Sequence, residues 1–221
     1  MNKFLAGLGM LAIVVLTGCA SMTTIHTAET LSPGSLNYYV AYVPSSAPLL
    51  DTNNDGKADK MDFNTVEVGA RIGLTDHIDL GAKLYPVGML IDGKYQFIKG
   101  KMFKAAGDLG AGYMTISSGE SKTSIVDIVP EVPLTIRPIS WFAFTLAPKS
   151  LIRISSSSND STKVSSSSTE VLFGTTAGLK FTVKNLGSLI FEYGVFGGSY
   201  ASNHFAIAVD KPLFGHGTDD E

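Results

Sequence analysis

The sequence predicts an all-β protein, an antiparallel up-and-down β-barrel of about ten strands, and three observations support this prediction. First, apolar and polar residues alternate with a period of two from Leu36 to Phe214, as they do in strands that have one apolar face. Second, the polar faces of these strands carry charges of both signs. Third, the connections between the expected strands alternate between tight turns and longer segments.

The alternation defines each expected strand in turn. Between residues 65 and 74, Val66, Val68 and Ile72 share one face, while Glu67 and Arg71 lie on the other. The same pattern places strands, in order, at 36–43, 65–74, 78–85, 89–98, 104–113, 126–137, 141–153, 170–183, 189–195 and 205–209. These ranges mark where the alternation is clear, and we expect the full strands to run to roughly 9–15 residues, the length that a tilted strand needs to cross a membrane.

The polar faces favour a closed barrel. A small barrel can fill its interior with opposite charges, each of which needs a partner where water is scarce. Residues of opposite sign that share a face are Glu67 and Arg71, Asp79 and Lys83, Asp92 and Lys94, and Glu131 and Arg137. The alternative is a soluble antiparallel domain, which would turn its apolar face inward and leave these charges in water.

Connections of two kinds are expected. Tight turns are predicted at 75–76, 99–100, 138–139 and 185–186, and long connections at 45–61 and 155–168. The second long connection is rich in serine and is expected to be a mobile surface loop. Together with the alternating strands, this arrangement resembles a bacterial outer-membrane β-barrel, which implies that the short turns face the periplasm. The chain departs from that pattern at its end, because Pro212 interrupts the last strand and Phe214 is followed by further residues.

The first residues have the layout of an export signal. Lys3 is followed by an apolar run, residues 4–16, which is too short to span a bilayer. The stretch Leu16-Thr17-Gly18-Cys19 resembles a bacterial lipobox. The resemblance implies cleavage before Cys19 and attachment of lipid, palmitate included, to its sulfur and to the new amino terminus. An ordinary export signal is the alternative.

These patterns divide the chain into four parts. We expect a lipoprotein signal peptide at 1–18, a lipidated amino terminus and tether at 19–34, the barrel at 35–214 and a carboxyl-terminal tail at 215–221. The lipid would hold the amino terminus on the periplasmic side of the outer membrane. An even number of strands would return the carboxyl terminus to the same side.

Composition excludes several classes of function. Seventeen Lys and Arg residues against twenty Asp and Glu residues give a net charge of −3, and no basic face for nucleic acid is visible. With Cys19 lipidated, no thiol remains for a disulfide, a thiolate metal site or a cysteine nucleophile. His26, His77 and His216 are scattered singly and have no metal-ligand spacing.

An acidic loop carries the clearest chemical motif. The segment from residue 51 to residue 62 resembles the calcium-binding loop of EF-hands, with Gly56 at the sharp turn. The expected ligands are Asp51, Asn53, Asp55, the carbonyl of Lys57, Asp59 and Asp62. The alternative is a solvated loop, because Asp, Asn and Gly favour turns in any case. Calcium would stiffen the loop, and no cofactor is expected to be required.

The predicted function is that of a lipid-anchored protein of the cell outer membrane, with a transmembrane barrel and a non-enzymatic structural or surface-interaction role. Its expected partners are outer-membrane lipid and an extracellular or periplasmic ligand, and the sequence leaves that ligand and the oligomeric state open. Three alternatives remain: a narrow channel or small-solute carrier, a lipid-tethered soluble β-domain, and a lipid-modifying enzyme. For the enzyme, Ser202 and His204, near Glu192, supply the residue types of a nucleophile and a base, although His204 is expected at a barrel end or in a loop.

Overall fold

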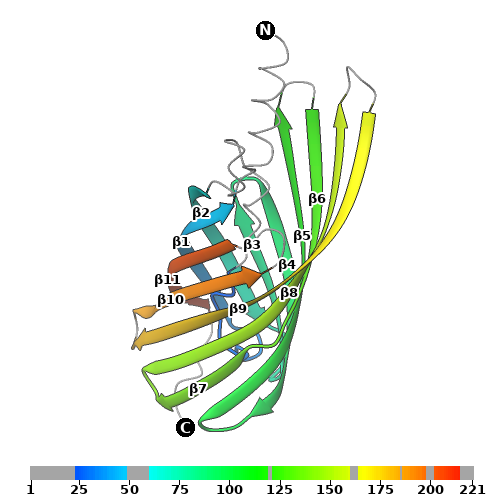
Figure 1. The fold of residues 1–221 in the computed structure, drawn as a ribbon. Coiled ribbons are helices and arrows are strands. Elements are labelled where there is room, and N and C mark those ends of the chain that lie inside the picture. The colour runs from blue at the N-terminus through cyan, green and yellow to red at the C-terminus, as the bar shows by residue number, and fades with distance from the viewer. Residues whose placement is uncertain are drawn as a thin grey trace.

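The computed structural model describes residues 23–48, 60–118, 121–159, 164–184, 186–197 and 202–214. These residues form eleven strands (Figure 1). The strands are β1 (Leu36–Pro48), β2 (Lys60–Gly73), β3 (Ile78–Tyr85), β4 (Gly88–Lys99), β5 (Phe103–Ser118), β6 (Ser121–Glu131), β7 (Leu134–Ile139), β8 (Phe142–Asn159), β9 (Val164–Val183), β10 (Gly187–Gly197) and β11 (Ser202–Phe214). Within the described residues, no helix is long and apolar enough to cross a membrane.

The sheet closes on itself. Each strand is antiparallel to its neighbours, and closure joins β1 to β11 as well as β4 to β5. β6 and β7 both pair with β5 and β8, so they share one position in the wall, and the eleven strands make a barrel of ten positions. The break between them is held by the amide of Val132, which donates to the carbonyl of Pro148 at 3.0 Å. The predicted closed antiparallel barrel is therefore confirmed, and its strands begin at Leu36 and end at Phe214 as expected.

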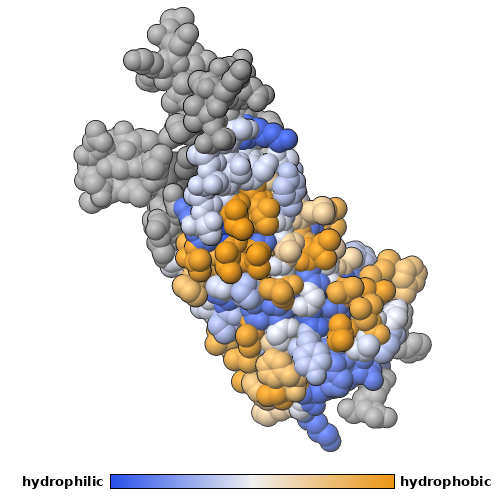
Figure 2. All heavy atoms as spheres, turned by 90° about the vertical axis from the view of Figure 1, so that its right-hand side faces the viewer, coloured by the Kyte–Doolittle hydropathy of each residue, from blue (hydrophilic) through white to orange (hydrophobic). Residues whose placement is uncertain are grey.

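The barrel is apolar outside and polar inside. On β2, Val68 is 47% exposed on the outer wall, whereas its neighbour Glu67 is only 1% exposed and faces the lumen. Orange side chains gather over the middle and lower wall in Figure 2, where β-branched, aliphatic and aromatic residues point outward. A soluble antiparallel domain would have the opposite distribution, because apolar surface is favourable only away from water.

The serine-rich segment is strand rather than loop. β8 runs to Asn159 and β9 starts at Val164, and their serines pair directly, for example Ser156 with Ser167 and Ser157 with Ser166. β6 continues the pairing on the other side of β8, where Thr123 Oγ1 lies 2.8 Å from Ser157 Oγ. The neighbouring backbones supply hydrogen-bond partners that the sequence pattern alone does not reveal. We call residues 115–118, 121–124, 156–159 and 164–167 the projecting sheet, because they pair with one another beyond the last pairing of β4 with β5 and extend past the other strands (Figure 1).

The two ends of the barrel differ. At the short-turn end, β2–β3, β4–β5, β7–β8 and β9–β10 are joined by residues 74–77, 100–102, 140–141 and 184–186. The opposite end, here the loop end, carries the projecting sheet and the connection between Pro48 and Lys60. Pro212 does not stop β11, which continues to Phe214, and the register shifts between Leu36 and Asn37 where β1 passes it.

Candidate functional site

Residues 23–35, the luminal segment, run inside the barrel except for Pro33 and Gly34, which are exposed. The sequence predicts a tether up to residue 34, but Thr23, Thr24, Ile25, Ala28 and Thr30 are all buried. Threonine is short, and its hydroxyl both donates and accepts hydrogen bonds, so a threonine-rich stretch suits a polar interior. The difference arises because partners for this stretch exist only after the wall has closed around it.

Side chains of the wall accept hydrogen bonds from the backbone amides of the luminal segment. Glu192 on β10 accepts from the amide of Thr24 at 2.9 Å and from that of Ile25 at 2.8 Å. Thr135 Oγ1 on β7 accepts from Ala28, Gln96 Oε1 on β4 from Thr30, and Asp79 Oδ1 on β3 from Leu31. Buried amides need such partners, and here side chains replace the neighbouring strand that would normally supply them.

Two lysines of the wall bind the carbonyls of the luminal segment. Lys83 Nζ on β3 donates to the carbonyl of Thr23 at 2.7 Å, and Lys94 Nζ on β4 donates to that of Thr27 at 3.1 Å. Lys94 also pairs with Asp79 Oδ2 at 3.1 Å, and both side chains are almost fully buried. The wall thus supplies acidic acceptors for the amides and basic donors for the carbonyls.

Threonine hydroxyls add further contacts. Thr23 Oγ1 donates to Glu67 Oε2 at 2.6 Å. Lys149 Nζ donates to Thr24 Oγ1 at 2.7 Å, and that oxygen lies 2.8 Å from Thr176 Oγ1. The luminal segment is therefore bound to β2, β8 and β9 as well, which means that it contacts the wall on all sides.

Ion pairs fill the remaining lumen. The predicted mixture of charges is confirmed, but in these pairs the two partners come from different strands rather than from the same strand. Arg153 on β8 binds Asp127 on β6 with two hydrogen bonds of 2.9 and 3.0 Å, and Lys149 lies 3.2 Å from Glu131. At the short-turn end, Glu29 of the luminal segment pairs with both Lys104 and Arg137. A buried charge persists only with such partners.

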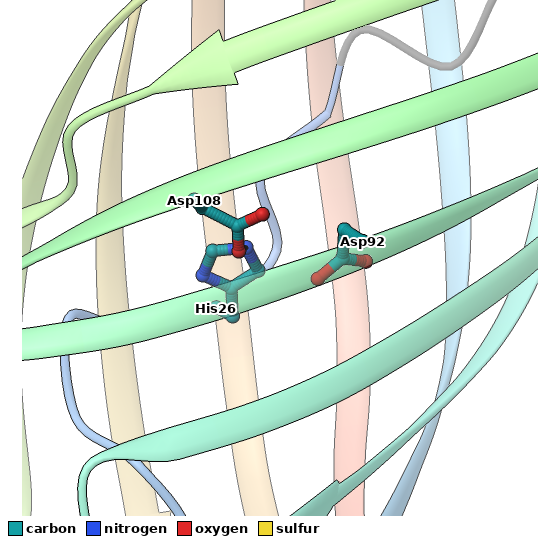
Figure 3. A group of neighbouring side chains, drawn as sticks. All are labelled: His26, Asp92 and Asp108. Atoms are coloured by element: carbon teal, nitrogen blue, oxygen red, sulfur yellow. Dashed lines mark ion pairs between the residues drawn. The ribbon is translucent and has the colours of Figure 1, made fainter.

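His26 forms the centre of a cluster that the sequence does not reveal. Its side chain points toward Asp108 and Asp92 (Figure 3), and one candidate ligand atom from each of the three lies within 4.8 Å of the others. His26 Nε2 lies 3.2 Å from Asp108 Oδ2 and 3.2 Å from Glu131 Oε1, while Nδ1 faces the carbonyl of Thr27 at 3.3 Å. Oxygens that can only accept hydrogen bonds surround both nitrogens, so the contacts favour the doubly protonated imidazolium.

The same cluster resembles a metal site in its residue types but already contains cations. Arg71 Nη2 contacts Asp92 and lies 3.4 Å from Asp108 Oδ2. A cavity of about 30 Å³ adjoins His26, Arg71 and Asp92, which is room for roughly two water molecules. The guanidinium and imidazolium thus neutralise the carboxylates that a metal ion would require, and we interpret the cluster as an anchor of the luminal segment.

His204 lies in the lumen rather than at a barrel end or in a loop. Its Nε2 is 3.1 Å from Glu192 Oε1, and both residues are only 4% exposed. Gly194 on β10 makes room for the ring, because a Cβ there would lie 2.1 Å from His204 Cε1. The structure therefore brings together the predicted His204 and Glu192, but Glu192 also holds the amides of Thr24 and Ile25.

Most of the other predicted site residues fall outside the described part of the chain. These are the lipidation residue Cys19 and the calcium ligands Asp51, Asn53, Asp55, Lys57 and Asp59. Asp62 is described: it is exposed in β2 and pairs with Ser46 of β1. The backbones of Pro48 and Lys60 also pair, so the residues that flank the segment 49–59 are held side by side.

Solved structures match this chain in fold, whereas no protein-family model and no curated protein matches it. The attachment invasion locus protein Ail of Yersinia pestis is 9% identical, with a TM-score of 0.39 over 82% of this chain and 99% of that one. Neisserial surface protein A is 11% identical, with a TM-score of 0.41 over 79% and 95%. The outer membrane protease OmpT from Escherichia coli is 7% identical, with a TM-score of 0.45 over 83% and 97%. These similarities concern the barrel fold alone.

Proposed function

We propose that the protein is an outer-membrane β-barrel lipoprotein whose lumen is closed by its own luminal segment, and that its role is structural or surface-interacting rather than enzymatic. The observation that carries this proposal is the hydrogen bonding of residues 23–31, whose amides and carbonyls bind side chains of the wall. A segment held in this way occupies the path that an open pore would need.

The outer wall supports the membrane placement. Each of the ten wall positions of the barrel carries exposed apolar side chains. A continuous apolar surface of this kind is typical of a barrel whose outer wall is covered by lipid. Trp141, 54% exposed, and Phe214, 63% exposed, lie at the short-turn end, where aromatic residues suit a lipid–water interface. The projecting sheet is rich in serine and threonine and would stand clear of the lipid at the loop end.

Electrical recording in planar bilayers tests the closed lumen. The wild-type protein should give no steady conductance, whereas a variant lacking residues 23–33 should conduct, because the backbone that the wall side chains hold in the lumen would then be missing. Val195→Ala on the outer wall serves as the matched control and should stay silent. Each protein is first checked for a heat-modifiable gel shift, which reports a folded barrel. Steady conductance by the wild-type protein, or silence of the folded deletion variant, would overturn the proposal.

A gated narrow channel is the second candidate. The luminal segment belongs to no strand of the sheet, so it is bound by side chains and not by a continuous backbone ladder. Displacing it would open the lumen without breaking the wall. Brief, voltage-dependent openings of the wild-type protein in the same recordings would favour this candidate over a permanently closed barrel.

The lipid anchor and the calcium loop belong to the same proposal. Cys19 would carry the lipid, as its Leu-Thr-Gly-Cys context predicts. The pairing of Pro48 with Lys60 supports a calcium site, because it brings together the residues that flank the segment 49–59, which carries five of the six expected ligands. Incorporation of an alkyne-labelled palmitate, lost in Cys19→Ala, tests the anchor. Calcium binding is tested by the stability measurement given in the Discussion.

A further inference from the structure

The wall recognises the luminal segment largely through its backbone. The amides that donate to side chains of the wall are those of Thr24, Ile25, Ala28, Thr30 and Leu31. The carbonyls that accept from Lys83 or Lys94 are those of Thr23, Thr27 and Glu29. Every residue except proline presents the same amide and carbonyl, so these contacts suit a polypeptide ligand in general. The lumen therefore has the contacts of a peptide-binding site.

Two charged side chains of the luminal segment fix its register. His26 lies 3.2 Å from each of two carboxylates, and Glu29, three residues later, pairs with two cations. The wall residues of these acidic and basic subsites are Asp108 with Glu131 and Lys104 with Arg137. A chain shifted by one residue, or entering in the opposite direction, would bring the wrong charge or none to the subsites. The matching ligand thus carries a cation and, three residues later, an anion.

Glu192 also selects the conformation of the bound chain. Its carboxylate accepts hydrogen bonds from two successive amides, those of Thr24 and Ile25. Successive amides converge on one anion in this way when the backbone turns through the left-handed region. Ile25 has a φ of 46°, and among the described residues it is the only one other than glycine with a positive φ. This conformation is unfavourable for a β-branched L-residue, so the site holds a turn that the free chain rarely adopts.

The site does not depend on the luminal segment for its shape. The segment belongs to no strand, and the wall closes without it, by pairing β1 with β11 and β4 with β5. Charges of the site also have partners on the wall itself, such as Lys94 with Asp79 at 3.1 Å and Lys149 with Glu131 at 3.2 Å. An emptied lumen would therefore keep its donors and acceptors in place for another ligand.

We propose that the lumen is a peptide-binding site that the luminal segment occupies as an internal ligand, and that a separate polypeptide segment of the same chemistry can replace it. That chemistry is a pair of hydroxylated residues, as at Thr23 and Thr24, then a cation, as at His26, and an anion three residues after it, as at Glu29. The inference rests on the proposed function, because the segment that closes the lumen is also the ligand. Binding is nevertheless measured without a membrane or a conductance.

A synthetic peptide of residues 23–32, with a fluorescent label at its carboxyl end, tests the proposal by fluorescence anisotropy. The receptor is the variant that lacks residues 23–33, in detergent micelles and with its heat-modifiable gel shift verified. We expect saturable binding to this variant, and at least tenfold weaker binding to the wild-type protein, whose own tethered segment fills the site. A folded deletion variant that binds the peptide no better than the wild-type protein does would overturn the proposal.

A second receptor covers the case in which the deletion variant does not fold. A protease recognition sequence is inserted between Pro33 and Gly34, which are exposed, and the full chain is cut only after it has folded. The severed luminal segment should then exchange for the labelled peptide, whereas in the uncut protein it should not. Cut and uncut proteins that bind the peptide equally would contradict the proposal.

Two altered peptides test the mode of binding. Exchange of the charges, His26→Glu with Glu29→Lys, brings like charges to both subsites and should weaken binding at least tenfold. Peptides with D-alanine or L-alanine in place of Ile25 differ only in handedness, and the D-alanine peptide should bind about tenfold more tightly because it favours a positive φ. Equal affinities within either comparison would mean that the peptide does not take the place of the luminal segment, and the proposal would be wrong.

These outcomes are separate from those that test the proposed function. Steady conductance by the wild-type protein, together with specific peptide binding by the deletion variant, would refute the closed lumen and leave the peptide site standing. A silent wild-type protein whose folded deletion variant conducts but binds no peptide would support the closed lumen and refute this inference.

Discussion

Glu192 on β10 accepts a 2.8 Å hydrogen bond from the backbone amide of Ile25 in the luminal segment. The same carboxylate binds the amide of Thr24 and the ring of His204, so one buried side chain joins the segment to two strands of the wall. Removing the carboxylate would leave three buried polar groups without their acceptor. This contact is therefore the clearest place to test whether the luminal segment closes the barrel.

Glu192→Ala should loosen the luminal segment and destabilise the barrel by about 3–5 kcal/mol, because it removes the buried partner of several donors. Glu192→Gln keeps one acceptor oxygen and replaces the other with a donor group, so it should lose less than Glu192→Ala. Urea unfolding in lipid vesicles measures the free energy of unfolding, and recordings in planar bilayers measure any ion conductance through the barrel. A Glu192→Ala protein that is as stable and as silent as Val195→Ala would argue against this role.

His26 should couple energetically to Asp108. The His26 ring lies between Asp108 and Glu131, and these contacts favour its imidazolium form, so His26→Gln removes the positive charge beside two carboxylates. Asp108→Asn should reduce the cost of that substitution, with a coupling energy of about 0.5–3 kcal/mol in a double-mutant cycle. The cycle is measured by urea unfolding. Additive effects of the two substitutions would mean that the 3.2 Å contact does not stabilise the protein.

A charge placed on the outer wall should destabilise the folded barrel, and the loss of folding free energy should increase with its depth in the membrane. Val68→Arg places a charge on the apolar wall and should cost about 2–4 kcal/mol of folding free energy in lipid vesicles. Ser156→Arg, on the exposed part of the projecting sheet, should cost little because that sheet would stand in water. Equal costs at the two positions would contradict the proposed placement of the membrane.

Calcium should raise the temperature at which the heat-modifiable gel shift is lost. A ligand that binds only the folded state stabilises it by mass action, so the gain should grow with calcium concentration and vanish with a chelator. The variant Asp51→Asn with Asp55→Asn keeps the shape of the loop and removes two charged ligands. If this variant responds to calcium as the wild-type protein does, calcium binds elsewhere.

The alternation of residues was sufficient to predict the barrel wall. Val68 faces outward and Glu67 faces inward, as the period of two requires, and the strands begin and end near Leu36 and Phe214. The position of each side chain relative to the wall is a local property, since it follows from the geometry of an extended backbone. The predicted mixture of inward charges follows from the same geometry.

The alternation could not predict which charged residues pair with each other. Arg71 shares a face with Glu67 on β2, yet its partners Asp92 and Asp108 come from β4 and β5. Charges from different strands meet only after register and closure set their heights in the lumen. The serine-rich tips of β8 and β9 show the same limit, because low-complexity residues form strands there through pairing with each other and with β6.

The sequence by itself determined which residues face the lumen, where the strands lie and that the interior is charged. These properties are local, because successive side chains of an extended strand point to opposite faces. Only the tertiary structure decided what fills that interior. The stretch from Thr23 to Thr30 has no strand periodicity and resembles a tether, and His26 looks isolated in the chain. Glu192, Thr135, Gln96 and Asp79 become its partners because closure of the barrel brings residues far apart in sequence around one enclosed, polar space.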